Sequence, residues 1–253
     1  MGALLAGKVV IVTGAAGGIG HATCHVLAAH GARLVLSDVG EGEHLAAAIV
    51  AGGGDAIYHR ADLASETAIA GLVDRAVDHF GRLDGAFNNA GIEQRNKPLA
   101  DLSLDEWERA IRIDLTAVFL CVKYQVRAML GHGGGAIVNT ASSLGQVAIP
   151  GAGEYIAAKH GVIGLTRAAS ADYAAQGIRV NAVLPGIVRT PLIARLLEEP
   201  SFAAMGEKLR ARHPIGRFGE PSEIGEAVAW LLSDAASFMS GAALACDGGY
   251  LSI

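Results

Sequence analysis

The stretch KVVIVTGAAGGIG, residues 8–20, decides the fold of this chain. Its first half is a run of mostly β-branched residues, which is typical of a strand covered on both faces. Its second half carries Gly14, Gly17, Gly18 and Gly20 and leads into a helical sequence. Such a turn lets the backbone approach a pyrophosphate closely, and the helix N-terminus presents free N–H groups to it. The turn indicates a dinucleotide site, although a tight strand–helix connection without a ligand would use the same glycines.

Outside this stretch, short apolar runs alternate with longer amphipathic stretches along the chain. The runs are rich in Val, Ile and Leu without polar alternation, and each intervening stretch is long enough for a crossover helix. This βαβ pattern predicts an α/β fold: one Rossmann-like, doubly wound parallel sheet of about seven strands with helices on both faces. The expected strands are Lys8–Thr13, Arg33–Ser37, Ala56–His59, Leu83–Asn88, Ala136–Thr140, Arg179–Leu184 and Ala242–Cys246.

We expect one domain to account for the whole chain, residues 1–253. The sequence is 51% hydrophobic and 18% charged, which is enough apolar material for one large core. It contains no Pro/Ser-rich linker and no repeat at a solenoid period. The exception to the regular alternation is Thr190–His213, an amphipathic insert that we expect to form a lid or to pack against another subunit. Its apolar residues are Leu192, Ile193, Leu196, Leu197, Phe202 and Met205.

Charge and cysteine content argue against several classes of function. With 20 basic and 25 acidic residues the formal net charge is −5, and there is no basic run, so we expect no nucleic-acid or membrane partner. Cys24, Cys121 and Cys246 lack the short paired spacings of disulfide frameworks and metal sites. His21 and His25 share a helix face but lack a third ligand, so no metal site is expected. Without a targeting signal or about 18 consecutive apolar residues, the sequence predicts a soluble, cytoplasmic protein.

Asp38 follows the second expected strand, about twenty residues after the glycine turn. A dinucleotide-binding fold places an acid here to accept hydrogen bonds from the adenosine ribose. Its carboxylate would repel a 2′-phosphate, and neither Gly17 nor Val39 supplies a compensating cation. The sequence therefore predicts NAD as the cofactor in preference to NADP. The alternative for Asp38 is a turn residue before Gly40.

Tyr155 and Lys159 lie four residues apart at the start of a helical stretch, Glu154–Gln176, and so share one face. A tyrosine that acts as a base near neutrality needs its ordinary pKa of about 10 lowered by about 3 units. An ammonium about 4 Å away, at an effective dielectric constant of about 20, supplies roughly the required 4 kcal/mol. Ser142 follows the expected strand Ala136–Thr140, where it could hold a substrate oxygen. Taken singly, Tyr155 and Lys159 would be a surface pair and Ser142 a turn former. Together with the glycine turn, the three residues indicate a catalytic group.

These motifs occur in the order and at the spacing typical of one enzyme family. They are Thr13-Gly-x-x-x-Gly-x-Gly20, Asn88-Asn-Ala-Gly91, Ser142, Tyr155-x-x-x-Lys159 and Pro185-Gly186, and the match covers the whole chain. In them the sequence resembles the short-chain dehydrogenase/reductase family. The resemblance implies a nicotinamide cofactor and the reversible oxidation of a secondary alcohol to a ketone. It also implies that Tyr155 is the acid/base, that Lys159 lowers its pKa and binds the nicotinamide ribose, and that Ser142 orients the carbonyl.

The resemblance further implies a set of cofactor contacts and a homotetramer. The adenine contacts are Asp62 and Leu63, the contacts at a strand end are Asn89, Ala90 and Gly91, and the contacts with the nicotinamide amide are Val188 and Thr190. The other residues expected at the cofactor are Gly14, Gly18, Ile19, Gly20, Asp38, Tyr155, Lys159, Pro185 and Gly186. The chain also ends in an apolar strand and tail, Ala242–Ile253, that a monomer would leave partly exposed.

Several longer stretches resemble the members of that family that oxidise cyclic diols, such as the chlorinated cyclohexadienediol dehydrogenases. They include Phe87-Asn-Asn-Ala-Gly91, Asn139-Thr-Ala-Ser142, Glu154-Tyr155, Lys159-His160 and His213-Pro-Ile-Gly-Arg-Phe218. This narrower resemblance implies a cyclic alcohol or diol as the substrate. Gln94, Gln146 and Glu154 fall near the expected substrate end of the sheet, where loop polarity explains them as well as substrate contact does.

One position departs from the family pattern. Most members have Asn in the helix before the serine strand, at a water-bearing kink that links the lysine to solvent, whereas this chain has Asp114. Asp has the shape of Asn but lacks its NH2 donor. The proton relay between the lysine and solvent would therefore run through the backbone carbonyl at this position, while the hydrogen bond of the side chain would change. We include Asp114 among the catalytic residues, with a solvated helix acid as the alternative.

The leading hypothesis is an oxidoreductase that transfers a hydride between NAD and a secondary alcohol or ketone, with a cyclic alcohol or diol as its small-molecule substrate. A 3-ketoacyl-carrier-protein reductase shares the scaffold, but it usually favours NADPH and offers basic residues to an acidic carrier. Asp38 and the net acidity disfavour it. A catalytically silent nucleotide-binding scaffold is a third hypothesis, which the joint presence of Ser142, Tyr155 and Lys159 disfavours.

Overall fold

The computed structural model describes residues 3–198 and 200–253, without the side chains of Leu192, 196–198 and 200–205, and its seven strands form one sheet. The strand order is β3-β2-β1-β4-β5-β6-β7, and each pair of neighbours is parallel. The order reverses between β1 and β4, which is where a doubly wound sheet opens a crevice for a ligand. The Rossmann-like fold expected from the sequence is confirmed. The strands are β1 (Val9–Thr13), β2 (Arg33–Ser37), β3 (Asp55–Tyr58), β4 (Gly85–Asn88), β5 (Gly135–Thr140), β6 (Ile178–Pro185) and β7 (Ala243–Cys246).

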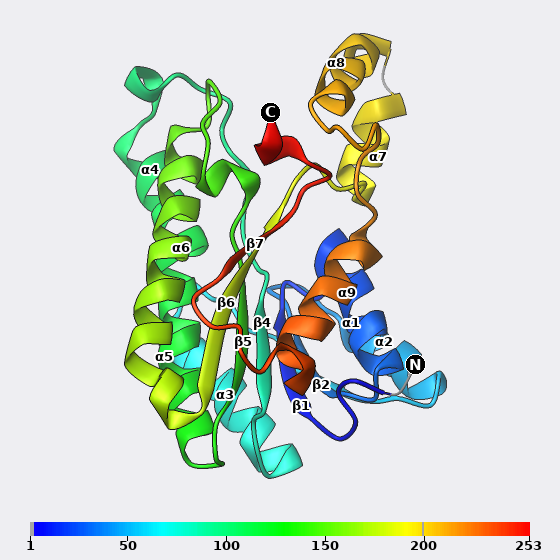
Figure 1. The fold of residues 1–253 in the computed structure, drawn as a ribbon, viewed down its shortest axis with the longest axis vertical. Coiled ribbons are helices and arrows are strands. Elements are labelled where there is room, and N and C mark those ends of the chain that lie inside the picture. Colours follow the sequence, from blue (N-terminus) through cyan, green and yellow to red (C-terminus); the bar gives the residue numbers. More distant parts are fainter. Residues whose placement is uncertain (1–2, 199) are drawn as a thin grey trace.

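Helices cover both faces of the sheet, as Figure 1 shows. On one face lie α1, α2 and α9, and on the other lie α3, α5 and α6. β2 has the expected bounds, and the other six strands differ from the expected ones by one or two residues at one or both ends, because terminal residues make only part of the ladder. The helices are α1 (Gly18–Ala29), α2 (Glu43–Ala51), α3 (Glu66–Phe80), α4 (Leu104–Ile111), α5 (Ala117–Leu130), α6 (Gly153–Tyr173), α7 (Pro191–Glu198), α8 (Pro200–Ala211) and α9 (Pro221–Leu232).

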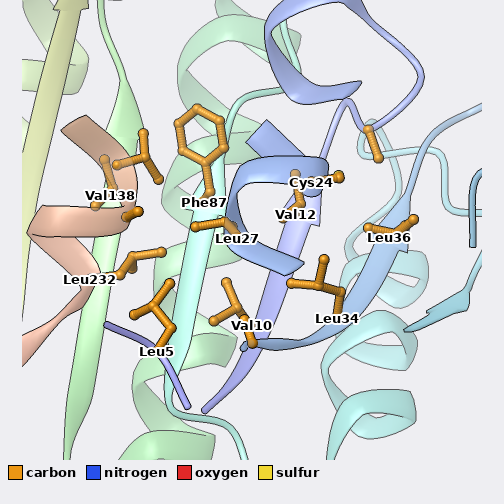
Figure 2. Close-up of a cluster of buried hydrophobic side chains, with 14 of the residues drawn as sticks. Leu5, Val10, Val12, Cys24, Leu27, Leu34, Leu36, Phe87, Val138 and Leu232 are labelled. Carbon is orange, nitrogen blue, oxygen red and sulfur yellow. The ribbon is translucent and has the colours of Figure 1, made fainter. Parts of the chain in front are cut away.

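The unbroken apolar runs are buried because helices pack on both sides of them. Every residue of β1 is buried, and so is every residue of β4. Side chains of β1 alternate between the two cores: Val10 and Val12 face α1 and α9, whereas Val9 and Ile11 face α3 and α5. Figure 2 shows the first of these cores. Its labelled members are Leu5, Val10, Val12, Cys24, Leu27, Leu34, Leu36, Phe87, Val138 and Leu232.

Between α4 and α5 the helix contains one π turn, Arg112–Thr116. A π turn inserts one extra residue into the helical register and is frequent at functional sites. Asp114 lies in this turn and is completely buried. The alternative of a solvated helix acid is therefore wrong, and the π turn lies at the position that departs from the family pattern.

The insert Thr190–His213 forms the helices α7 and α8, which lie beyond the end of the sheet, above α9 in Figure 1. Five of the apolar side chains expected to line a lid, those of Leu192, Leu196, Leu197, Phe202 and Met205, lie outside the described part of the structure. In the described residues, no helix is long and apolar enough to cross a membrane.

Candidate functional site

The motif residues gather at one edge of the sheet because all seven described strands run in the same direction. The carboxyl ends of parallel strands meet at this edge, where open α/β sheets bind their ligands. Thr13 ends β1, Asp38 follows β2, Asn88 ends β4, Thr140 ends β5 and Pro185 ends β6. Residues far apart in the sequence therefore share one site.

The glycine turn between β1 and α1, the cradle of the candidate site, packs so closely against neighbouring segments that side chains on its glycines would clash with them. Gly14 has a φ of +65°, and a Cβ there would lie 2.8 Å from the Cα of Ala90. A Cβ on Gly18 would lie 2.8 Å from the Cβ of Thr190. The N-cap residue of α1, Gly17, supplies no side-chain cap, and the first turn carries no acidic residue. Backbone N–H groups at the start of α1 therefore remain available, which fits the pyrophosphate of a dinucleotide.

Asp38 closes one side of this cradle. Its Oδ2 accepts a hydrogen bond from the N–H of Ala16 at 3.0 Å, and its Oδ1 accepts one from the N–H of Val39 at 2.7 Å. The residue is half-buried, so its remaining lone pairs can accept bonds from ribose hydroxyls. Ala61 donates its N–H to the carbonyl of Asp38 at 3.0 Å, which brings the adjacent Asp62 to the same edge.

The structure places a cation here that the sequence analysis missed. Arg60 donates from Nε to the carbonyl oxygen of Val39 at 2.8 Å, next to Asp38. Arg60 lies just beyond β3, and the parallel pairing of β2 with β3 brings it alongside the end of β2. No local motif reveals this contact, because it depends on strand register.

The segment after β4 is fixed to the glycine turn. The hydroxyl oxygen of Thr13 accepts the N–H of Asn89 at 3.0 Å and that of Ala90 at 3.2 Å. The side chain of Asn89 donates to the carbonyl of Gly14 at 3.2 Å. Below them, Asn88 belongs to a buried amide network with side chains of α5, β5 and α6, namely Gln125, Asn139 and Thr166. A fully bonded buried network holds the strand ends in one arrangement.

Tyr155 and Lys159 occupy one face of α6, as expected. The ammonium nitrogen of Lys159 lies 5.4 Å from the centre of the Tyr155 ring. It donates a hydrogen bond to the carbonyl oxygen of Thr140 at 3.1 Å, so the end of β5 fixes its position. Lys159 is 3% exposed while Tyr155 is half-buried, so the cation is shielded from water and the phenol remains accessible.

Asp114 lies beside this cation. Its Oδ1 is 3.7 Å from the Lys159 nitrogen and accepts the N–H of Ile92 at 2.9 Å. Its Oδ2 is buried and has no hydrogen-bond partner among the described residues. Burial raises the pKa of Asp114 above its ordinary value, although the Lys159 ammonium opposes the shift. A Cβ on Gly91 would lie 2.6 Å from Oδ1, so only glycine fits there.

Ser142 caps a short 3-10 turn, Ser143–Gly145, that packs against α6. Its hydroxyl oxygen accepts the N–H of Leu144 at 3.1 Å, which leaves the hydroxyl proton free to be donated. A Cβ on Gly145 would lie 3.0 Å from the carbonyl oxygen of Lys159, so the turn and the helix are in close contact. Ser142 is thereby held near the face of α6 that carries Lys159.

The loop after β6 completes the edge. Val188 pairs with Gly219 in an isolated bridge, and Thr190 lies against Gly18 of the cradle. His213, which is 2% exposed, accepts the N–H of Ile187 on Nε2 at 3.1 Å, and its Nδ1 lies 2.9 Å from the carbonyl of Leu209. The end of α8 is thus tied to the loop that follows Pro185 and Gly186, a role for His213 that the sequence did not reveal.

The remaining candidates are distributed as follows. Asp62 caps a turn by accepting the N–H of Ala64 at 2.9 Å, and Leu63 packs on the core. Gln146 is exposed and Gln94 is half-buried. Glu154, for which loop polarity was a sufficient explanation, is instead 1% exposed. His21 and His25 stack edge to face at 4.9 Å, and the described residues contain no cluster of three or more potential metal ligands.

Comparison with known proteins agrees with this arrangement. A family model described as enoyl-(acyl carrier protein) reductase matches residues 14–251. A 2,5-dichloro-2,5-cyclohexadiene-1,4-diol dehydrogenase from Sphingobium indicum is 50% identical over 250 residues, 98% of this chain and 99% of that protein. A cis-4-hydroxycyclohexanecarboxylate dehydrogenase from Sinomonas cyclohexanicum is 48% identical over 254 residues, 100% of both chains.

A solved structure is similar over its whole length. A putative NAD(P)-dependent gluconate 5-dehydrogenase from Beutenbergia cavernae, with NADP bound at low occupancy, superposes with a TM-score of 0.92 at 36% identity. The alignment covers 100% of each chain. The motif residues that meet at the carboxyl edge are thus part of a match that spans the molecule, and the chain belongs to the short-chain dehydrogenase/reductase family of NAD(P)-dependent oxidoreductases.

Proposed function

We propose that this protein is an NAD-dependent dehydrogenase of secondary alcohols, with a cyclic alcohol or diol as its substrate. The observation that carries the proposal is the placement of Tyr155 at the carboxyl edge of the sheet. There it is half-buried, and Lys159 below it is fixed on the carbonyl of Thr140 at 3.1 Å. A phenol backed by a shielded cation is suited to exchange a proton with a substrate hydroxyl.

Each polar group has a distinct part in this chemistry. When bound, the nicotinamide cofactor accepts the hydride that leaves the alcohol carbon. Tyr155 takes the proton of the substrate hydroxyl, and Ser142 donates a hydrogen bond to the same oxygen. Lys159 stabilises the negative charge on the phenol, and its own position is fixed by Thr140 and by the neighbouring Asp114. In the opposite direction, Tyr155 returns the proton to the carbonyl oxygen.

The chain's own groups also fit the cofactor. The glycine cradle and the uncapped start of α1 would hold the pyrophosphate, and Asp38 would hold the adenosine ribose. The strand end Asn89–Gly91 and the loop residues Val188 and Thr190 would contact the nicotinamide half. NAD is proposed over NADP because the carboxylate of Asp38 repels a 2′-phosphate.

A cyclic substrate is proposed from the relatives. Two proteins that match nearly all of this chain at 50% and 48% identity carry the names of dehydrogenases of a cyclohexadienediol and of a hydroxycyclohexane carboxylate. We also propose that the chain forms one domain with 190–213 as a lid or insert, that it assembles as a homotetramer and that it works in the cytoplasm.

A screen of secondary alcohols with NAD, followed by NADH absorbance, tests the proposal. It should include cyclohexanol, cyclohexane-1,2-diol, cyclohexane-1,4-diol and open-chain alcohols of equal carbon number. We expect turnover of the cyclic compounds and much slower turnover of the open-chain ones. Tyr155→Phe is the control, because it keeps the ring and removes the reacting hydroxyl. It should bind NADH normally and lose turnover, whereas near-normal turnover would refute the assigned mechanism.

A further inference from the structure

Glu154 is a buried carboxylate that the proposed chemistry does not use. It lies at the start of α6, one residue before Tyr155, and is 1% exposed. Its Oε1 accepts the backbone N–H of Arg95 at 2.6 Å, and its Oε2 is buried without a hydrogen-bond partner in the described residues. The guanidinium of Arg95 does not neutralise it, because that group donates to Glu106 instead. Burying a polar group is unfavourable unless it is hydrogen-bonded, so the bond to the Arg95 N–H is the contact among the described residues that compensates for the burial of Glu154.

Glu154 binds the backbone of a loop that belongs to the candidate site. Arg95 belongs to the segment 89–98, which begins on the glycine turn through the bonds of Asn89 and Ala90 to Thr13. The same segment is held at a second point, where Asp114 accepts the N–H of Ile92 at 2.9 Å. Two buried carboxylates thus each accept one backbone N–H of the same loop, three residues apart. One of them lies beside Lys159 and the other directly precedes Tyr155.

The next residues of the loop are tied to the same helix start. Lys97 forms an isolated bridge with Ala152, the N-cap residue of α6. The side chains of Arg95 and Lys97 point the other way, to Glu106 of α4, at 3.3 and 2.6 Å. The backbone of the loop is therefore attached to α6, and its charged side chains are attached to α4. Of these contacts with α6, the hydrogen bond to Glu154 lies nearest in sequence to Tyr155.

We propose that Glu154 is a positioning residue, which fixes the segment Ile92–Arg95 against the start of α6 so that the segment forms a wall of the site facing the substrate alcohol. The inference rests on the proposed dehydrogenase function. It predicts that loss of the carboxylate weakens substrate binding and leaves the cofactor cradle unchanged, because Thr13 holds the cradle end of the loop independently. Gln at this position keeps an oxygen acceptor for the Arg95 N–H, so it should restore the wild-type behaviour.

The test compares Glu154→Ala and Glu154→Gln with Glu108→Gln, which changes an exposed carboxylate on α4. For Glu154→Ala we expect amide exchange in residues 93–97 to rise by about tenfold and KM for the alcohol to rise by a similar factor, as the loss of one backbone anchor implies. The kcat and the dissociation constant of NADH should stay within about twofold of wild type, since the cradle is untouched. Glu154→Gln and Glu108→Gln should match the wild type in all four quantities.

Two results would overturn the inference. One is unchanged amide exchange in residues 93–97 in Glu154→Ala, and the other is a fall in kcat at constant KM. The exchange and NADH measurements need no substrate, so they remain decisive if the wild-type enzyme oxidises no alcohol in the screen. In that case the proposed function fails, while the exchange result still shows whether Glu154 anchors the loop.

Discussion

At the scale of single residues, Asp38 and Arg60 present opposite charges at the ribose end of the cradle. Asp38 is held by two backbone N–H groups, and Arg60 bonds the carbonyl of Val39 beside it. We expect the protein to bind NADH about a hundredfold more tightly than NADPH, about 3 kcal/mol, from the ribose bond and the charge repulsion. Fluorescence titration with both cofactors measures this directly, and equal affinities would contradict it.

Two substitutions separate the contributions of these charges. Asp38→Asn removes the repulsion and keeps the size of the side chain. It should therefore reduce the ratio of NADH affinity to NADPH affinity by about tenfold or more. Arg60→Ala removes the nearby cation, so it should widen the preference for NADH. If the ratio of NADH affinity to NADPH affinity is unchanged in both variants, the cofactor specificity is set elsewhere in the site.

Asp114 is buried beside Lys159, and burial raises the pKa of its carboxyl. The acid is charged above this raised pKa, where its carboxylate lies 3.7 Å from the Lys159 nitrogen. Asp114→Asn keeps the shape, so turnover should stay within about tenfold of wild type, about 1.4 kcal/mol in the barrier. The difference between the two forms should be present above that pKa and vanish as the pH falls through it, because both side chains are then neutral.

Asp114→Ala completes the series. It removes the acceptor of the Ile92 N–H as well as the charge, so it should reduce turnover considerably more than Asp114→Asn does. Turnover measured against pH for the three forms decides the role. If the alanine variant follows the wild type across the whole profile, Asp114 is an ordinary helix residue.

At the scale of secondary-structure elements, Glu106 joins α4 to the loop after β4. It accepts bonds from Lys97 and Arg95 and from the backbone of Ser103, in a capping box at the start of α4. The Lys97 ammonium, followed by the Ser103 N–H, lowers the pKa of the Glu106 carboxyl to about 2 from the ordinary 4.5. Because the folded protein holds the charged form, Glu106 stabilises the fold above the unfolded pKa of 4.5, and this contribution is lost as the pH falls towards about 2.

Glu106→Gln should therefore lower the free energy of unfolding at pH 7 and pH 5 and make little difference near pH 2. Urea unfolding at the three pH values, in variant and wild type, measures the effect. Glu108→Gln, on the same helix and exposed, is the control and should have no comparable effect. A Glu106→Gln difference of equal size at every pH would contradict an electrostatic origin.

At the scale of the whole molecule, the described surface exposes large apolar side chains in separate places. Phe238 and Ile253 are exposed near β7, which ends the strand order of the described sheet. Phe119 and Leu130 are exposed on α5. An uncovered sheet edge and exposed aromatic rings favour association with further copies of the chain.

We expect light scattering after gel filtration, at micromolar concentration, to give four times the mass of the chain. Phe238→Glu and Phe119→Glu should each reduce the assembly to a smaller one, since each places a charge in a different apolar surface. Ala48→Glu, at an exposed position of α2, serves as the comparison for the effect of added charge. A monomeric wild type would contradict the proposed tetramer.

The sequence alone determined the fold class and the candidate residues at the centre of the proposed site. Strand runs without polar alternation imply burial on both faces, and a βαβ series joins parallel strands by crossover helices, so the parallel sheet followed from local pattern, whereas the strand order came from the structure. Gly14, Tyr155 and Lys159 were identifiable because their spacing within one turn or one helix is itself the signal. The structure confirms the sheet and places these residues at its carboxyl edge.

Only the tertiary structure decided how side chains from separate elements meet. The burial of Asp114 depends on the π turn, the contact of Arg60 with Val39 depends on strand register, and the burial of Glu154 depends on a loop that begins 65 residues earlier in the chain. Local sequence carries no signal of these contacts, because burial and the environment of a charge arise from residues distant in the chain. A carboxylate read from the sequence can be a solvated surface group or a buried anchor, and the packing around it determines which.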